Sequence, residues 1–301
     1  MKCGICGSDN TEVIYDDVVR NGGIGKYTGE KYQMYQCQEC GTIFHKLDEA
    51  KSDEYYQSKE YRLEMNETAD VDGYDRLHDV EVLEKLQYTG TDIYRNKIVA
   101  DIGCGGGSFL DFVAGAAKEI VAIEPSKSFR KALSLKGYHT YPYAGDAING
   151  FAGKVDVVTS FDVIEHVNDP VEFMKDVHTL LSDRNNHPGG VAIIGTPSDC
   201  PFMRTLLGKV YEQRVLFSYQ HPWILSVKSF ELCCRKAGFT DVRIETKQRY
   251  DLANVINWCI EKRPTGHAKL DCVTPAMSEV YRKELEQKGM GDYLVAYVRK
   301  Q

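Results

Sequence analysis

The sequence contains no apolar run of about 18 residues, which is the length that a membrane-spanning helix requires. Its start, MKCGICGSDN, lacks the apolar segment of a secretory signal. An excess of basic residues is also missing, since 37 Lys and Arg stand against 44 Asp and Glu, for a formal net charge of −7. An acidic balance disfavours nucleic acid as the main partner. We therefore expect a cytoplasmic protein with no membrane segment.

Internal repeats and low-complexity tracts are absent, and the composition, 43% hydrophobic and 27% charged, is that of a globular chain. Its 301 residues leave room for one large α/β domain and a small module. Runs of Val and Ile without polar alternation predict strands buried on both faces of a parallel sheet. These runs begin near residues 97, 119, 155 and 189, and the helices expected between them span 108–117, 126–136 and 170–181.

Two later strand-like segments, 242–250 and 292–300, follow each other without a full βαβ spacing. They predict that the last strand is antiparallel. The fold class is therefore α/β, with a mostly parallel, doubly wound sheet, a small N-terminal zinc ribbon and a helical cap. The expected domains are a ribbon at 1–48, a helical linker at 49–95, and a main domain at 96–301 with cap insertions near 201–225 and 251–290.

Four of the ten cysteines form two CxxC pairs, Cys3 with Cys6 and Cys37 with Cys40, and a glycine follows each pair. In a reducing compartment this spacing indicates metal binding rather than disulfides. Four thiolates make a closed tetrahedral site, so we expect one structural zinc. Because residues 1–48 contain little continuous apolar sequence, we expect the metal to supply much of the cohesion of this segment.

The segment VADIGCGGG at 99–107 places a glycine-rich turn between a buried strand and a helix. Gly103 and Gly105 can adopt backbone angles that are closed to other residues, and they let a ligand lie against the main chain. Glu124 ends the next strand, 21 residues after Gly103, where a carboxylate can accept hydrogen bonds from an adenosine ribose. The dinucleotide fingerprint is not matched, because Ser108 occupies the position of its third glycine.

These residues resemble the class I S-adenosylmethionine-dependent methyltransferases over roughly residues 75–200. Four motifs carry the resemblance: DIGCGGG at 101–107, EPS at 124–126, GDA at 145–147 and FDVIEHV at 161–167. The resemblance implies a seven-stranded, Rossmann-like methyltransferase sheet with S-adenosylmethionine (SAM) as the methyl donor.

The resemblance also implies a role for each motif. Asp101 and the backbone of the glycine turn would hold the methionine end of the donor, Glu124 would hold its ribose, and the amide of Ala147 with Asp146 would bind the adenine edge. Phe161 and Asp162 would flank the sulfonium and the amino group. The implied donor-binding residues are Asp101, Gly103, Cys104, Gly105, Gly107, Glu124, Pro125, Asp146, Ala147, Phe161 and Asp162, with Cys104 packing inside the turn.

Two histidines are candidates for a general base, should the acceptor be a hydroxyl: His166, just past the fourth motif, and His221, in the sequence His-Pro-Trp. The segment Asp162-x-x-Glu165-His166 also resembles the ExxEH pattern of metal-dependent quinone O-methyltransferases, with Asp in place of the first Glu. That resemblance leaves a catalytic Mg²⁺ open.

We expect methyl transfer to a small molecule, with a nucleotide-linked sugar preferred because a zinc-binding segment before a methyltransferase domain resembles sugar methyltransferases. The alternatives are a metal-assisted O-methyltransferase on a quinone or phenol, a ribbon-guided RNA or protein methyltransferase, and a non-catalytic scaffold. The ribbon would brace the active site or make a subunit contact, so a dimer stays open. Tyr55, Tyr56 and Tyr61 are candidates for the mouth of the site, with simple packing as the other interpretation.

Overall fold

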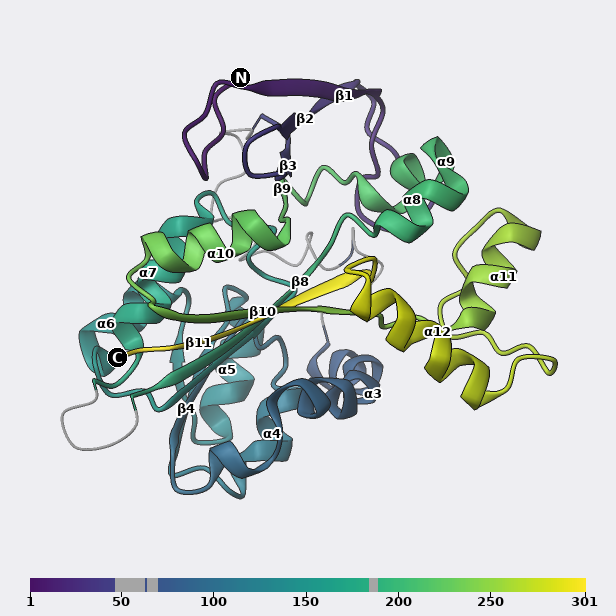
Figure 1. The fold of residues 1–301 in the computed structure, drawn as a ribbon. Coiled ribbons are helices and arrows are strands. Elements are labelled where there is room, and N and C mark those ends of the chain that lie inside the picture. The colour runs from purple at the N-terminus through teal and green to yellow at the C-terminus, as the bar shows by residue number, and fades with distance from the viewer. Residues whose placement is uncertain (47–62, 64–69, 184–188) are drawn as a thin grey trace. The chain divides into compact units, whose positions relative to one another are not determined.

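The computed structural model describes residues 1–46, 63, 70–183 and 189–301 (Figure 1). Tyr55, Tyr56, Tyr61 and much of the first half of the expected 49–95 linker lie outside the described residues. The chain forms two compact units. The first comprises Met1–Lys46, Thr196–Phe230 and Ile244–Val295, and the second comprises the described residues of 47–195 with Glu231–Arg243 and Ala296–Gln301.

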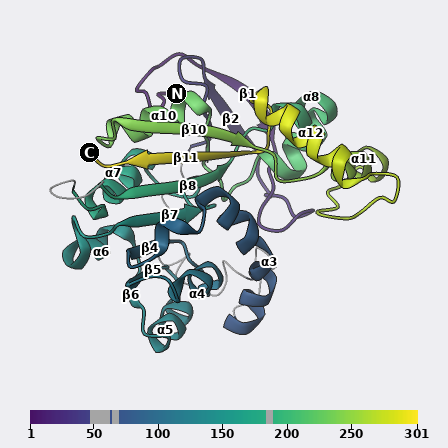
Figure 2. The ribbon, with the colours of Figure 1, turned by 60° about the horizontal axis from the view of Figure 1, so that its bottom comes forward.

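A seven-stranded sheet confirms the predicted α/β fold class. Its strand order is β10-β11-β8-β7-β4-β5-β6 (Figure 2). The strands are β4 (Ile98–Ile102), β5 (Glu119–Ile123), β6 (His139–Tyr141), β7 (Val157–Phe161), β8 (Val191–Pro197), β10 (Asp241–Lys247) and β11 (Tyr293–Arg299). The pairs β4–β5, β5–β6, β4–β7 and β7–β8 are all parallel. The chain order reverses between β4 and β7, and such a reversal opens a ligand crevice at the carboxyl ends of the strands.

The helices of the second unit begin where the sequence offers a capping residue. Asp70 accepts a hydrogen bond from the Gly73 amide at the start of α3. Asp169 caps α7, which opens with Pro170 at its first position. The helices are α3 (Val71–Thr89), the 3₁₀ turn Asp92–Tyr94, α4 (Ser108–Ala114), α5 (Lys127–Leu135), α6 (Ala144–Phe151) and α7 (Pro170–Leu180), with α10 (Val227–Lys236) shared between the units. The helices expected at 108–117, 126–136 and 170–181 are confirmed to within a few residues.

The first unit contains a four-stranded sheet with the order β1-β2-β3-β9. Its strands are β1 (Thr11–Asp17), β2 (Tyr32–Cys37), β3 (Ile43–Phe44) and β9 (Trp223–Ile224), all paired antiparallel. The last of them comes from about 180 residues further along the chain. The same unit holds α8 (Pro201–Leu207), α9 (Lys209–Tyr211), the π-helix Glu212–Leu216, α11 (Leu252–Glu261) and α12 (Pro275–Gln287).

One apolar core unites the ribbon strands with the helical segments of the first unit. Met34 and Ile43 of the ribbon are almost fully buried in the same cluster as Phe217, Ile224 and Trp258. The ribbon therefore does not depend on a metal alone, because burying large apolar side chains of this kind stabilises a fold by about 1.5–3 kcal/mol each. Among the described residues, no helix combines the length and the apolar character needed to cross a bilayer.

Candidate functional site

The glycine-rich turn follows β4 and is fixed to the end of β5. The amides of Gly103 and Cys104 both donate to the carbonyl oxygen of Ile123, at 2.7 and 3.3 Å. Gly103 and Gly105 have φ values of 77° and 57°, in the left-handed region that side chains disfavour. The turn thus needs glycine for its backbone angles, as the sequence predicted.

Glu124, which follows β5, is hydrogen-bonded to the glycine turn that follows β4. Its carboxylate is 1% exposed and accepts hydrogen bonds from the Gly105 amide at 3.0 Å and from the Ser126 amide at 2.8 Å. A carboxylate has about four acceptor sites, which makes this group chemically suited to accept hydrogen bonds from the hydroxyls of a ligand. The structure thus places the carboxylate of Glu124 directly against the glycine turn.

Asp101 is a buried carboxylate at the end of β4. It accepts a hydrogen bond from the Thr159 hydroxyl at 2.7 Å. Burial raises the pKa of Asp101 to about 6, while the Thr159 hydrogen bond and the nearby Lys85 act to lower it. Lys85 lies on α3, with its Nζ atom 5.8 Å from the centre of the Phe161 ring. The ionised form of such a buried carboxylate is stabilised by any further cation that binds beside it.

Helix α3 covers the glycine turn, which the sequence did not predict. A Cβ atom placed on Gly105 would lie 2.7 Å from the Cζ atom of Tyr74, and one on Gly106 would collide with the carboxylate of Asp75. Tyr74 is itself buried, and its ring lies 4.8 Å from that of Phe129 on α5. Close packing of α3 is thus a second reason for glycine at Gly105 and Gly106.

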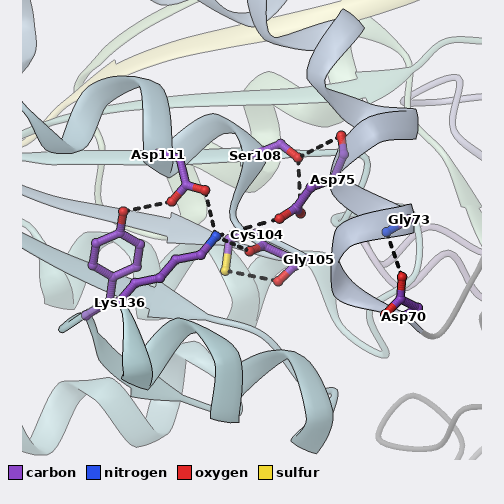
Figure 3. A network of polar contacts seen from close by, with 10 residues as sticks. Asp70, Gly73, Asp75, Cys104, Gly105, Ser108, Asp111 and Lys136 are labelled. Atoms are coloured by element: carbon purple, nitrogen blue, oxygen red, sulfur yellow. Dashed lines mark hydrogen bonds and ion pairs between the residues drawn. The ribbon is translucent and has the colours of Figure 1, made fainter.

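A polar network holds the outer side of the turn (Figure 3). Lys136 donates to the Gly106 carbonyl oxygen at 3.2 Å, and its Nζ atom lies 2.6 Å from Asp111 and 3.6 Å from Asp75. Ser108 at the start of α4 donates to Asp75 at 3.3 Å. These contacts tie α3, α4 and the segment after α5 to one loop, although no sequence motif marks Lys136.

A cavity of about 350 Å³ opens beside the turn, within the second unit. Its wall includes Gly103 and Pro125 of the predicted donor motifs, Tyr143 before α6, and Val163 and His166 after β7. This volume is in the range typical of small-ligand sites. Tyr143 was not predicted as a site residue, and Val163 was named only as part of the fourth motif. A cavity wall is assembled from separate loops, so it leaves no periodic signal in the sequence.

The remaining predicted donor residues lie outside the cavity wall, in different environments. Asp146 is exposed on the first turn of α6, while Ala147 is buried, and neither lines the cavity. Phe161 is 8% exposed and packs edge-on against Phe109. Asp162 is exposed and adopts φ 58°, an unusual angle for a residue with a side chain, and such angles are frequent at functional sites.

Cys104 is confirmed as a buried residue of the turn, and Gly107 ends the turn as the cap of α4. Burial, together with the Asp101 and Glu124 carboxylates, raises the pKa of Cys104 well above its ordinary value. Cys104 therefore stays a neutral thiol at neutral pH and packs inside the turn.

The two candidate bases lie in different units. His166 lines the cavity of the second unit, with its Nε2 atom 4.0 Å from the Glu165 carboxylate. His221 lies in the first unit, directly before the buried Pro222. The predicted catalytic roles of both stay predictions.

The four ribbon cysteines converge on one point in the first unit. Their ligand atoms all lie within 4.8 Å of one another, with Sγ separations of 3.7 Å between Cys3 and Cys40 and 3.4 Å between Cys6 and Cys37. A tetrahedral zinc with Zn–S bonds of about 2.3 Å requires sulfur atoms about 3.8 Å apart. The donor set and the spacing therefore fit one structural zinc with no open position.

Each cysteine pair forms the same tight turn. The Gly7 amide donates to the Cys3 carbonyl oxygen at 2.9 Å, and the Gly41 amide donates to that of Cys37 at 2.8 Å. Burial raises the pKa of Cys40. At Cys37 burial acts in the same direction, but hydrogen bonds with the Cys40 backbone, the Cys6 side chain and the Glu39 backbone outweigh it and lower the pKa to about 7. Backbone donors aimed at sulfur are what a thiolate cluster needs.

A family model described as a methyltransferase domain matches residues 74–244, more than half of the chain. The chain is 28% identical over 204 residues to a ubiquinone biosynthesis O-methyltransferase of Xanthomonas euvesicatoria, and the match covers 63% of this chain and 83% of that protein. A protein of the same name from Psychrobacter arcticus is 28% identical over 186 residues, covering 55% of this chain and 70% of that one.

Solved structures give the same fold. A SAM-dependent methyltransferase from Archaeoglobus fulgidus has a TM-score of 0.51 at 16% identity, covering 76% of this chain and 96% of that one. Another from Thermotoga maritima has a TM-score of 0.51 at 21% identity, covering 77% and 96%. At such identities the likeness concerns the fold alone.

Proposed function

The chain belongs to the methyltransferase-domain family, and from that membership we propose that this SAM-dependent methyltransferase methylates a hydroxyl group of a small molecule. The observation that carries the proposal is the junction of the left-handed glycine turn with the buried Glu124 carboxylate beside a cavity of about 350 Å³. A bare turn, a carboxylate acceptor and an apolar cavity together suit a nucleoside with an amino-acid tail.

Each part of this junction has a proposed task. Asp101 attracts the ammonium group of the donor, Glu124 accepts hydrogen bonds from its ribose, and the cavity holds its base. When bound, the donor would supply an already activated methyl group to the acceptor hydroxyl oxygen, whose proton a histidine base would take, and S-adenosylhomocysteine would be the leaving group. Because the methyl group is activated, alignment of the reacting atoms contributes most to the rate, by about 7–11 kcal/mol in favourable cases.

Oxygen is the proposed target because the curated relatives quoted above are named O-methyltransferases. These relatives are 28% identical to this chain, and their names favour a quinol or phenol as acceptor over the nucleotide-linked sugar that the ribbon suggests. A divalent metal is not required by this proposal. Glu165 and His166 supply a carboxylate and an imidazole 4.0 Å apart, a pair that suits Mg²⁺ or Mn²⁺ and also suits an oriented histidine base.

We propose that the zinc ribbon serves catalysis by fixing the loop that carries His221. Gln220 is fully buried, and its side chain accepts from the Gly22 amide at 2.9 Å and donates to Asn21 at 2.7 Å. The Tyr219 amide donates to the Arg20 carbonyl oxygen at 2.8 Å. The ribbon thereby holds Tyr219 and Gln220, immediately before the candidate base.

The test compares calorimetric donor binding with turnover. The wild-type protein should bind S-adenosylhomocysteine and methylate a catechol or quinol, with a nucleotide-linked sugar as the alternative acceptor. His221→Ala should lower kcat by about 10²-fold or more without changing donor affinity, as loss of a general base does. His166→Ala is the matched variant on the donor cavity. If both variants keep full turnover, neither histidine is the base, and if the wild type binds no donor the proposed function fails.

A further inference from the structure

The donor cavity has three carboxylates on its wall, and two of them are already engaged. Asp169 accepts hydrogen bonds from the amides of Val171 and Glu172, at 2.8 and 3.1 Å, as the cap of α7. Glu172 pairs with Lys175 at 2.6 Å, and its side chain is 62% exposed. Both groups therefore already have partners within the chain.

Asp176 is the third carboxylate, one turn further along α7. Its Oδ2 atom would lie 3.5 Å from a Cβ atom placed on Gly145, so the carboxylate stands over the first turn of α6. Tyr143 and Ala144, which precede Gly145, line the same cavity. No hydrogen bond or ion pair with a described residue engages Asp176.

Burial, followed by repulsion from Glu172 and Asp146, raises the pKa of Asp176. The negative charge is therefore uncompensated, and a hydrogen-bond donor brought into the cavity would stabilise it. Much of the wall is apolar, with Ile123, Pro125, Val163 and Phe173 among its residues. Such a wall suits the faces of a planar base, and the carboxylate suits a polar group on its edge.

We propose that Asp176 accepts a hydrogen bond from the 6-amino group of the donor's adenine and thereby selects adenine over other purines. This inference rests on the proposed donor site. It assigns the base edge to a residue of α7, whereas the sequence motif pointed to Asp146, which is exposed and does not line the cavity. A carboxylate accepts but does not donate, so it rejects hypoxanthine, whose 6-oxo group is also an acceptor.

The experiment measures the affinity of the full chain for S-adenosylhomocysteine and for S-inosylhomocysteine by calorimetry. The wild type should prefer the adenine compound by about tenfold or more, the scale of one hydrogen bond to a charged group. Asp176→Asn should reduce that preference by about tenfold, because an amide can turn its oxygen toward an amino group or its N–H toward an oxo group. Glu172→Gln, on the same wall, should keep the wild-type preference.

The analogue with unsubstituted purine supplies a second readout on the wild-type protein. It lacks the 6-amino group, so it should bind about tenfold more weakly than S-adenosylhomocysteine. An unchanged preference in Asp176→Asn, or equal binding of the purine analogue by the wild type, would overturn the assignment of Asp176 while leaving donor binding intact. Absence of any S-adenosylhomocysteine binding by the wild type would overturn the proposed function and this inference together.

Discussion

Asp101 offers the sharpest test of the donor site, because the structure holds its carboxylate at the expense of stability. Burial raises its pKa from an ordinary 3.8 to about 6. At about 1.4 kcal/mol for each tenfold change in proton affinity, the ionised side chain costs the folded protein about 3 kcal/mol at neutral pH. We therefore expect Asp101→Asn to raise the free energy of unfolding by up to about 3 kcal/mol at pH 8.

The sign of the pH dependence is opposite to that of a salt-bridged carboxylate. Between about pH 4 and pH 6 the folded protein binds a proton at Asp101 that the unfolded chain has lost. Stability therefore falls as pH rises through this window, and the cost stays constant above it. Asparagine carries no such cost, so the stability difference between variant and wild type should close as the pH falls toward 4.

Urea unfolding of wild type and Asp101→Asn at pH 4, 6 and 8 measures this difference. Asp241→Asn is the control, since that side chain is 57% exposed and its ion pair with Arg299 spans 3.9 Å. The variant should also bind S-adenosylhomocysteine more weakly, and wild-type binding should be roughly tenfold weaker at pH 5 than at pH 8, because protonation removes the charge that attracts the ammonium group. A variant equally destabilised at every pH would refute the reasoning.

Three further perturbations address the turn and the ribbon. Gly105→Ala should weaken donor binding at least tenfold in calorimetry, because its Cβ atom would meet Tyr74 at φ 57°, whereas Gly115→Ala, with open space around it, should bind normally. Lys136→Met should weaken donor binding several-fold and leave kcat at saturating donor unchanged; unaltered affinity would count against the network around Gly106. Cys37→Ser should reduce the bound zinc, measured by metal analysis, from about one per chain to none, and should lower the melting temperature. Cys272→Ser, at an exposed cysteine, should change neither the zinc content nor the melting temperature.

Much of the fold could be predicted because its signals are local. The apolar runs at β4, β5, β7 and β8 identified buried parallel strands, and the glycines after β4 marked the turn. Strand β6 (His139–Tyr141) gave no such signal, since it is three residues long and partly exposed at the sheet edge. The pairing of Trp223–Ile224 with the ribbon strand β3 was equally invisible, because two residues carry no periodicity.

The candidate site divides in the same way. The spacing predicted that Glu124 ends the strand after the glycine turn, and parallel strands bring their carboxyl ends to one edge. It could not show that Tyr74 and Asp75 would cover that turn, because contacts of a helix depend on where it docks. The wall carboxylate Asp176 was missed for the same reason.

The order of residues in this chain determined the elements that are made from neighbours: the CxxC turns, the buried strands and the glycine loop. Only the tertiary structure decided which distant groups share a site, such as Gln220 with Gly22 or Asp176 with Tyr143. The physical reason is that backbone angles and strand burial follow from short-range sterics and hydrophobic patterning, whereas a cavity wall or a buried hydrogen bond exists only after the chain has packed against itself.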